Sequence, residues 1–152
     1  FDALNCKLIG LSIDSHYSHI AWLRTIKEKI EWNGMKGMEV KFPVIADLTM
    51  EVAKKYGIVQ PGASNTQAVR AEYFIDPAAK IRALVYYPLS NGRNLDEVMR
   101  LLIAMQTSDA NGIATPANWQ PGDDVIVPPP GSCGVAKERT AKHGQAAEAS
   151  YA

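Results

Sequence analysis

The amino-acid sequence predicts an α/β fold in which a mixed sheet is flanked by helices. Strand-like apolar runs at residues 7–13 and 42–46 are separated by a segment with helical periodicity. Two further strand-like segments, residues 69–75 and 81–87, follow one another closely and are succeeded by a second helical pattern. Strands that alternate with helices indicate an α/β layer fold, and the late hairpin makes the expected sheet mixed.

Each early element has its own signal. Residues 7–13 (Lys-Leu-Ile-Gly-Leu-Ser-Ile) form a mostly apolar run that reads as a buried strand. An amphipathic helix is expected over residues 15–32, because apolar side chains recur there every three or four residues, at Ile20, Leu23, Ile26 and Ile30. Residues 42–46 predict a second buried strand. We expect Thr49 to cap a short helix that runs through Tyr56, with Gly57 just past its end.

The second half begins with a hairpin. Residues 58–67 contain proline, glycine, serine and asparagine and read as a loop. The segment Asp-Pro-Ala-Ala-Lys at residues 76–80 suits a turn between strands, since proline favours its second position. Asn94, with Glu97 three residues later, resembles a capping box that opens a helix reaching about Gln106. We therefore expect a core over residues 1–106 and a proline-punctuated C-terminal extension over residues 107–152, with one short strand at 124–127 and a mobile tail.

Composition narrows the function classes. Of the 152 residues, 47% are apolar and 21% charged, and the formal net charge is zero. This balance leaves no excess of positive charge that would indicate nucleic-acid binding. The longest apolar segments are too short to span a bilayer. Two cysteines far apart, Cys6 and Cys133, do not suggest a disulfide scaffold, so we expect a cytosolic protein.

Several motifs occur in a specific order. They are Leu-Ser-Ile-Asp-Ser (11–15), His-Tyr-Ser-His-Ile-Ala-Trp (16–22), Phe-Pro-Val-Ile-Ala-Asp (42–47), Ala-Val-Arg-Ala-Glu-Tyr-Phe-Ile-Asp (68–76), Tyr-Pro-Leu-Ser-Asn-Gly-Arg-Asn (87–94) and Ala-Thr-Pro-Ala-Asn-Trp-Gln-Pro-Gly-Asp (114–123). From residue 1 to about residue 130, this series resembles the one-cysteine, C-terminally extended peroxiredoxins, a family of thiol-dependent peroxidases. The resemblance implies a thioredoxin-like sheet.

Those enzymes use a cysteine in a Pro-x-x-x-Thr-x-x-Cys motif, which does not occur in these 152 residues. Because the chain opens on Phe1, we expect it to be the downstream part of a longer polypeptide. The family fold places the strand before that cysteine between the strands matching residues 7–13 and 69–75. We therefore expect these residues alone to be inactive and not to fold stably, since backbone groups inside the sheet would lack partners.

Two arginines are candidate catalytic residues. Arg70 lies in an apolar strand pattern, where its ordinary role would be a pair with Glu72 or Asp76. The resemblance implies instead that Arg70 favours the cysteine thiolate and orients the peroxide, as a fixed guanidinium can. Arg93 would ordinarily be a solvated cation or pair with Asp96; the resemblance implies a second, supporting electrostatic role.

The other candidates have ordinary readings beside the functional ones. Cys6 lacks the motif and reads as a small, partly buried thiol. Cys133 is either an idle surface thiol or a resolving cysteine, although it lacks the aromatic-rich setting usual for the latter. His16 and His19 share a helical segment without a third metal ligand nearby, so His19 is expected to make a structural hydrogen bond.

The resemblance implies reduction of hydrogen peroxide and alkyl hydroperoxides through a sulfenic acid, with a thiol as electron donor. It implies no metal, haem, flavin or nicotinamide, and it implies a homodimer or a ring of dimers, with residues 114–127 against the neighbouring subunit. The alternative is a truncated, non-enzymatic interaction or assembly subunit of the same ancestry. A plain thioredoxin-like oxidoreductase is a third reading, but there is no Cys-x-x-Cys motif.

Overall fold

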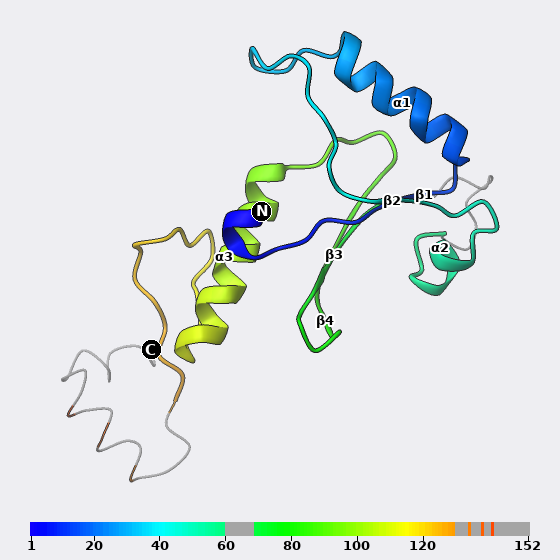
Figure 1. Ribbon diagram of the computed structural model, residues 1–152. Coiled ribbons are helices and arrows are strands. Elements are labelled where there is room, and N and C mark those ends of the chain that lie inside the picture. Colours follow the sequence, from blue (N-terminus) through cyan, green and yellow to red (C-terminus); the bar gives the residue numbers. More distant parts are fainter. Residues whose placement is uncertain (60–68, 130–133, 135–137, 139–140, 142–152) are drawn as a thin grey trace. The chain divides into compact units, whose positions relative to one another are not determined.

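The structure is a computed structural model that describes residues 1–59, 69–129, 134, 138 and 141. Contacts divide the chain into two units, Phe1–Arg93 and Asn94–Ala152. In the first unit a short 3₁₀ helix, η1 (Asp2–Leu4), precedes β1 (Gly10–Ser12), α1 (His16–Lys29), β2 (Val44–Ala46), α2 (Glu51–Lys55), β3 (Arg70–Ile75) and β4 (Ile81–Tyr87) (Figure 1). The second unit contains α3 (Leu95–Asn111). The element order expected from the sequence is confirmed.

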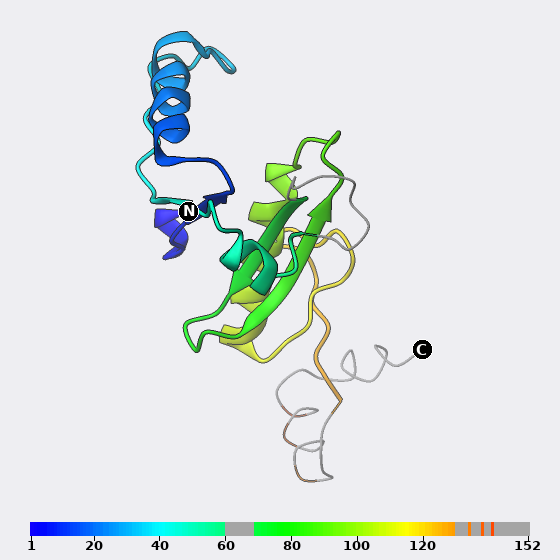
Figure 2. The ribbon, with the colours of Figure 1, turned by 90° about the vertical axis from the view of Figure 1, so that its right-hand side faces the viewer.

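The strands form one parallel and one antiparallel pair. β1 pairs with β2 in parallel, with Gly10 opposite Val44, and β3 pairs with β4 antiparallel, with Arg70 opposite Tyr87. Figure 2 shows β3 and β4 as a long twisted ribbon. Within the described residues each pair is its own two-stranded sheet, so every strand has one edge without a neighbouring strand.

Local chemistry explains where α1 begins. Ser15 is the N-cap, and its hydroxyl accepts a hydrogen bond from the backbone N–H of Ser18 at 3.2 Å. The hydroxyl of Ser12, in β1, lies 2.6 Å from Nε2 of His19, which is buried. The structural hydrogen bond expected for His19 is thus present, and it joins α1 to β1.

The predicted cap of α2 is wrong. Asp47, not Thr49, holds this helix: its Oδ2 accepts from the N–H of Ala53 at 2.6 Å and its Oδ1 from that of Val52 at 3.3 Å. Met50 takes a left-handed conformation with φ of 57°, which turns the chain so that the earlier carboxylate reaches the helix. Gly57 follows the helix with φ of 68°, as expected.

The hairpin agrees with its prediction. The N–H of Ala79 donates to the carbonyl of Asp76 at 2.9 Å, which closes the turn that contains the proline. The carboxylate of Asp76 also accepts from the N–H groups of Ala78 and Lys80, both at 2.9 Å. On one side of the hairpin Tyr73 and Tyr86 join their hydroxyls at 2.5 Å, and the Tyr73 hydroxyl donates to the carbonyl of Tyr56.

In the second unit, Asn94 caps α3 as predicted, accepting from the N–H groups of Asp96 at 3.1 Å and Glu97 at 3.2 Å. The helix continues beyond the predicted end near Gln106 and stops at Gly112, whose φ is 61°. The strand expected at residues 124–127 is reduced to a single bridge between Ile126 and Ala114. The boundary between core and extension at residues 106 and 107 stays a prediction.

Few side chains are buried in the described residues. The buried apolar ones are Ala53, Ile58, Ala104 and Trp119. Trp22 and Trp32 are 51% and 64% exposed, so of the three tryptophans only Trp119 packs inside. Among the described residues, none of the helices combines the length and the hydropathy that a transmembrane segment needs.

Candidate functional site

Arg70 begins β3, and its guanidinium is held by backbone. Its Nε donates to the carbonyl oxygen of Leu89, in the loop after β4, at 3.1 Å. The residue is exposed, so its charge does not incur the burial cost that its apolar neighbours suggested. Neither Glu72 nor Asp76 pairs with it in the described chain, which removes the ordinary reading of Arg70 as a carboxylate partner.

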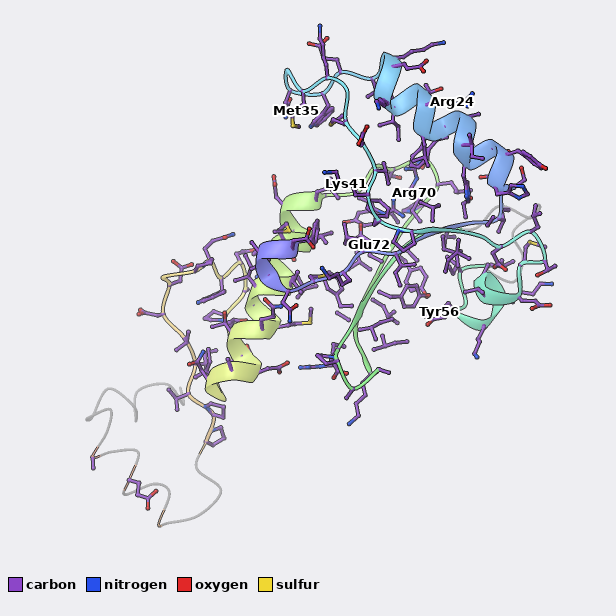
Figure 3. All side chains as sticks on the ribbon, viewed as in Figure 1. Arg24, Met35, Lys41, Tyr56, Arg70 and Glu72 are labelled. Carbon is purple, nitrogen blue, oxygen red and sulfur yellow. The ribbon has the colours of Figure 1, made fainter. Side chains whose placement is uncertain are left out.

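Arg93 has an unexpected partner. Its Nε lies 3.0 Å from Oε1 of Glu72, which points from β3, whereas the sequence suggested Asp96. The Glu72 side chain is only 13% exposed, and that of Arg93 is 39% exposed. Glu72 is two residues from Arg70, so the alternation of a strand places both on one face of β3 (Figure 3). The structure therefore places Arg70 and Glu72 on one face of β3 and brings Arg93 into contact with Glu72.

Electrostatics at this cluster are unbalanced. Burial raises the pKa of the Glu72 carboxyl, and the nearby Arg93 charge opposes that rise only in part. The other oxygen, Oε2, is buried and has no hydrogen-bond partner among the described residues. Two cations and one partly desolvated carboxylate leave a net positive charge, which is suited to an anion such as a thiolate.

Glu72 is the residue that sequence reasoning missed as a site component. The sequence suggests Glu72 only as an ordinary ion-pair partner of Arg70, with Asp76 as the other candidate. Its real partner comes from a loop beyond the second strand of the hairpin, and no sequence spacing encodes that contact.

Cys6 takes no part in this cluster. Cys6 is a free, partly exposed thiol whose Sγ lies 3.9 Å from the carbonyl oxygen of Lys7, in accord with its expected ordinary role. Cys133 lies outside the described residues. No group of three or more metal-ligating side chains occurs in the part of the chain that the structure describes, and His19 is engaged with Ser12.

Comparison with known proteins gives a consistent result. The model of the AhpC/TSA family matches residues 1–84, and that of the C-terminal domain of 1-Cys peroxiredoxin matches residues 104–139. A peroxiredoxin of Methanosarcina mazei is 63% identical over 142 residues, which are 93% of this chain and 65% of that protein. One of Archaeoglobus fulgidus is 51% identical over 146 residues, again 93% and 65% of the two chains. The chain thus spans about 65% of the length of these curated relatives.

Solved structures agree. The structure of yeast mitochondrial 1-Cys peroxiredoxin has a TM-score of 0.78 and 41% identity, and the match covers 95% of this chain and 67% of that one. A cysteine-to-serine mutant of peroxiredoxin 6 of Arenicola marina has a TM-score of 0.77 and 34% identity, over 91% and 63% of the two chains. These likenesses confirm the predicted thioredoxin-like peroxiredoxin fold. The chain belongs to the AhpC/TSA family of peroxiredoxins and carries the C-terminal domain of its 1-Cys members.

Proposed function

We propose that this chain is the arginine-bearing part of a thiol-dependent peroxidase. The observation that carries the proposal is the geometry of Arg70, whose Nε is held by a backbone carbonyl. Among the described residues, its two terminal amino groups have no protein partner and are available to an anion. Arg93, whose Nε is held by the Glu72 carboxylate, adds a second cation. Membership of the peroxiredoxin family supports assigning this anion site to a thiolate and a peroxide.

The reaction needs a cysteine from outside the printed sequence. Within the described residues both two-stranded sheets have open edges, which supports a further strand and its Pro-x-x-x-Thr-x-x-Cys segment completing the fold. The cysteine thiolate attacks one peroxide oxygen and the O–O bond breaks. The thiolate sulfur is oxidised to a sulfenic acid, and the departing oxygen takes a proton and leaves as water or an alcohol. Arg70 stabilises the thiolate and the charge that develops on the departing oxygen, with Arg93 in support.

A thiol then restores the cysteine. It condenses with the sulfenic acid to give a mixed disulfide and water, and a second thiol reduces that disulfide. The yeast relative is described as resolved by glutathione and thioredoxin systems, so we propose a small or protein thiol as the electron donor here. A homodimer or larger ring in the cytosol, with Cys133 as a candidate resolving thiol, completes the proposal.

The test uses the complete protein, meaning these 152 residues joined to a segment with the Pro-x-x-x-Thr-x-x-Cys motif. Hydrogen peroxide consumption is followed with dithiothreitol as donor, and a dimedone adduct reports the sulfenic acid. Arg70→Lys keeps the charge but loses the planar donor pair, and should reduce turnover by about 10²-fold or more. Arg24→Lys, at an exposed position of α1, is the matched control.

Unchanged turnover in Arg70→Lys, with normal folding by circular dichroism, would remove Arg70 from the site. The alternative function is a non-enzymatic assembly subunit, and an intact-mass measurement separates the two. A native polypeptide with the mass of these residues alone and no peroxidase activity would support the subunit.

A further inference from the structure

Glu72 is a carboxylate in an unusual position. It lies mid-strand in β3, its side chain is 13% exposed, and Oε2 is buried without a hydrogen-bond partner in the described chain. Buried carboxylate oxygens are normally paired, and one left vacant costs free energy. An apolar side chain would fit a strand interior at lower cost. The presence of a carboxylate at this position points to a role beyond packing.

That role follows from the atom that Glu72 contacts. Oε1 engages Nε of Arg93 at 3.0 Å, which is the inner nitrogen of the guanidinium. A bidentate pair would occupy one or two terminal amino groups, as Glu97 does when it binds both Nε and Nη2 of Arg100. At Arg93 the single contact leaves both terminal amino groups without a protein partner in the described residues. Glu72 thus anchors the side chain and does not occupy its outer edge.

The residues of β4 that lie opposite Glu72 and Arg70 carry no formal charge. Val85 is the cross-strand partner of Glu72, and Tyr87 faces Arg70 two pairs further along. The charged groups next to the carboxylate are Arg93, in contact with it, and Arg70, two residues away on the same face of β3. The carboxylate therefore has one cation in contact with it and a second two residues away along β3.

We propose that Glu72 is the positioning residue for Arg93 in the peroxidase reaction. It holds the guanidinium by Nε so that the terminal amino groups remain available to the reacting thiolate and peroxide. Its negative charge also reduces the positive potential that the two arginines create at the thiolate. This inference rests on the proposed peroxidase function and specifies how one part of that site is built.

The test compares Glu72→Gln, Glu72→Leu, Arg93→Met and the two double variants in the complete protein. Gln keeps an acceptor for Nε and removes the charge, whereas Leu removes both. Glu31→Gln is the matched control, since Glu31 forms an exposed pair with Lys36 at 2.9 Å. Two readouts are recorded: the pH dependence of peroxidatic thiol alkylation by iodoacetamide, and the stopped-flow rate constant with hydrogen peroxide.

The charge effect appears in alkylation. Glu72→Gln should lower the thiol pKa, which raises the alkylation rate below that pKa by about threefold. The positioning effect appears with peroxide. The rate constant of Glu72→Leu with hydrogen peroxide should be about tenfold lower than that of Glu72→Gln, because only leucine leaves the Nε of Arg93 without an acceptor. In the Arg93→Met background the difference between Gln and Leu should disappear.

A thiol pKa unchanged in Glu72→Gln, or a Gln–Leu difference that persists without Arg93, would overturn the inference. The isosteric Gln variant keeps the charge test available if the Leu variant does not fold. The two readouts also separate the proposals. If wild-type protein consumes no peroxide, the peroxidase proposal fails, whereas alkylation still reports whether Glu72 acts on the cysteine through Arg93.

Discussion

The hydroxyl of Ser12 and Nε2 of His19 lie 2.6 Å apart and join the end of β1 to the first turns of α1. His19 is 8% exposed, so its imidazole depends on this contact for a hydrogen bond. The Ser12 hydroxyl also lies 3.1 Å from Oδ2 of Asp14, to which it donates, so this serine organises the whole strand-to-helix turn.

Ser12→Ala should therefore destabilise the complete protein by about 1–3 kcal/mol, because it leaves a buried imidazole nitrogen unpaired. Urea unfolding followed by circular dichroism measures the change in free energy. Ser90→Ala, which removes an exposed hydroxyl, serves as control and should stay within about 0.5 kcal/mol of wild type. Equal effects in the two variants would contradict the structural role of the Ser12–His19 contact.

The Asp47 carboxylate should be the dominant cap of α2. Asp47→Ala removes two acceptors from the N–H groups of Val52 and Ala53 and is expected to cost about 1–2 kcal/mol. Thr49→Ala should cost much less, because Thr49 makes no cap contact with this helix in the structure. Thermal unfolding of both variants gives the comparison, and a larger loss in Thr49→Ala would restore the interpretation made from sequence.

Tyr73 should titrate late. Burial, the hydrogen bond with Tyr86 and the neighbouring tyrosines raise the pKa of Tyr73 to about 12 from an ordinary value of 10.0. The neutral phenol is favoured in the folded state, so this stabilisation is fully present below pH 10 and is lost as the pH rises through about 12. Absorbance titration of tyrosinate should show one late group that is missing in Tyr73→Phe. A wild-type curve without that late group would refute the assignment.

The contribution of Glu72 to folding stability should depend on pH in the opposite direction to that of an ordinary ion-paired carboxylate. Burial raises the pKa of Glu72 above its ordinary value of 4.5, so the folded state holds the proton more tightly than the unfolded state. Its contribution to stability is complete below pH 4.5 and is lost as the pH rises through the raised value. Wild type should therefore gain stability relative to Glu72→Gln when the pH falls from 7 toward 4.5. Urea midpoints of wild type and Glu72→Gln, measured at several pH values, test the direction of this change. If wild type instead loses stability relative to Glu72→Gln as the pH falls, the ion pair with Arg93 outweighs the effect of burial.

Sequence reasoning succeeded where the determining chemistry is local. Asn94 was correctly predicted as a cap because its side chain acts on N–H groups two and three residues away. The hairpin followed from its turn residues and from strands that are close in sequence. The prediction from sequence failed at Thr49, which residue preference indicated as the cap of α2. The left-handed conformation of Met50 instead brings the Asp47 carboxylate to the helix.

The end of α3 was missed for a different reason. Apolar periodicity fades after Gln106, but the helix continues to Asn111 and stops at Gly112, which can adopt a left-handed conformation. For the candidate site, the sequence suggests Glu72 as a partner of Arg70, whereas the actual pairing of Glu72 with Arg93 depends on the path of a loop. Contacts of that kind arise from tertiary structure and have no signature in residue spacing.

The two strand pairs differ in how far apart their partners lie along the chain. β3 and β4 are separated only by residues 76–80, whereas β1 and β2 are separated by residues 13–43, which include α1. Closing a longer loop costs more chain entropy, and antiparallel neighbours with a tight turn form early in folding. The hairpin that carries Arg70 and Glu72 is therefore expected to be a folding nucleus, onto which the parallel pair assembles later. The cross-strand contacts of the hairpin would then govern the rate of folding. They would also govern the positions of Arg70 and, through Glu72, of Arg93.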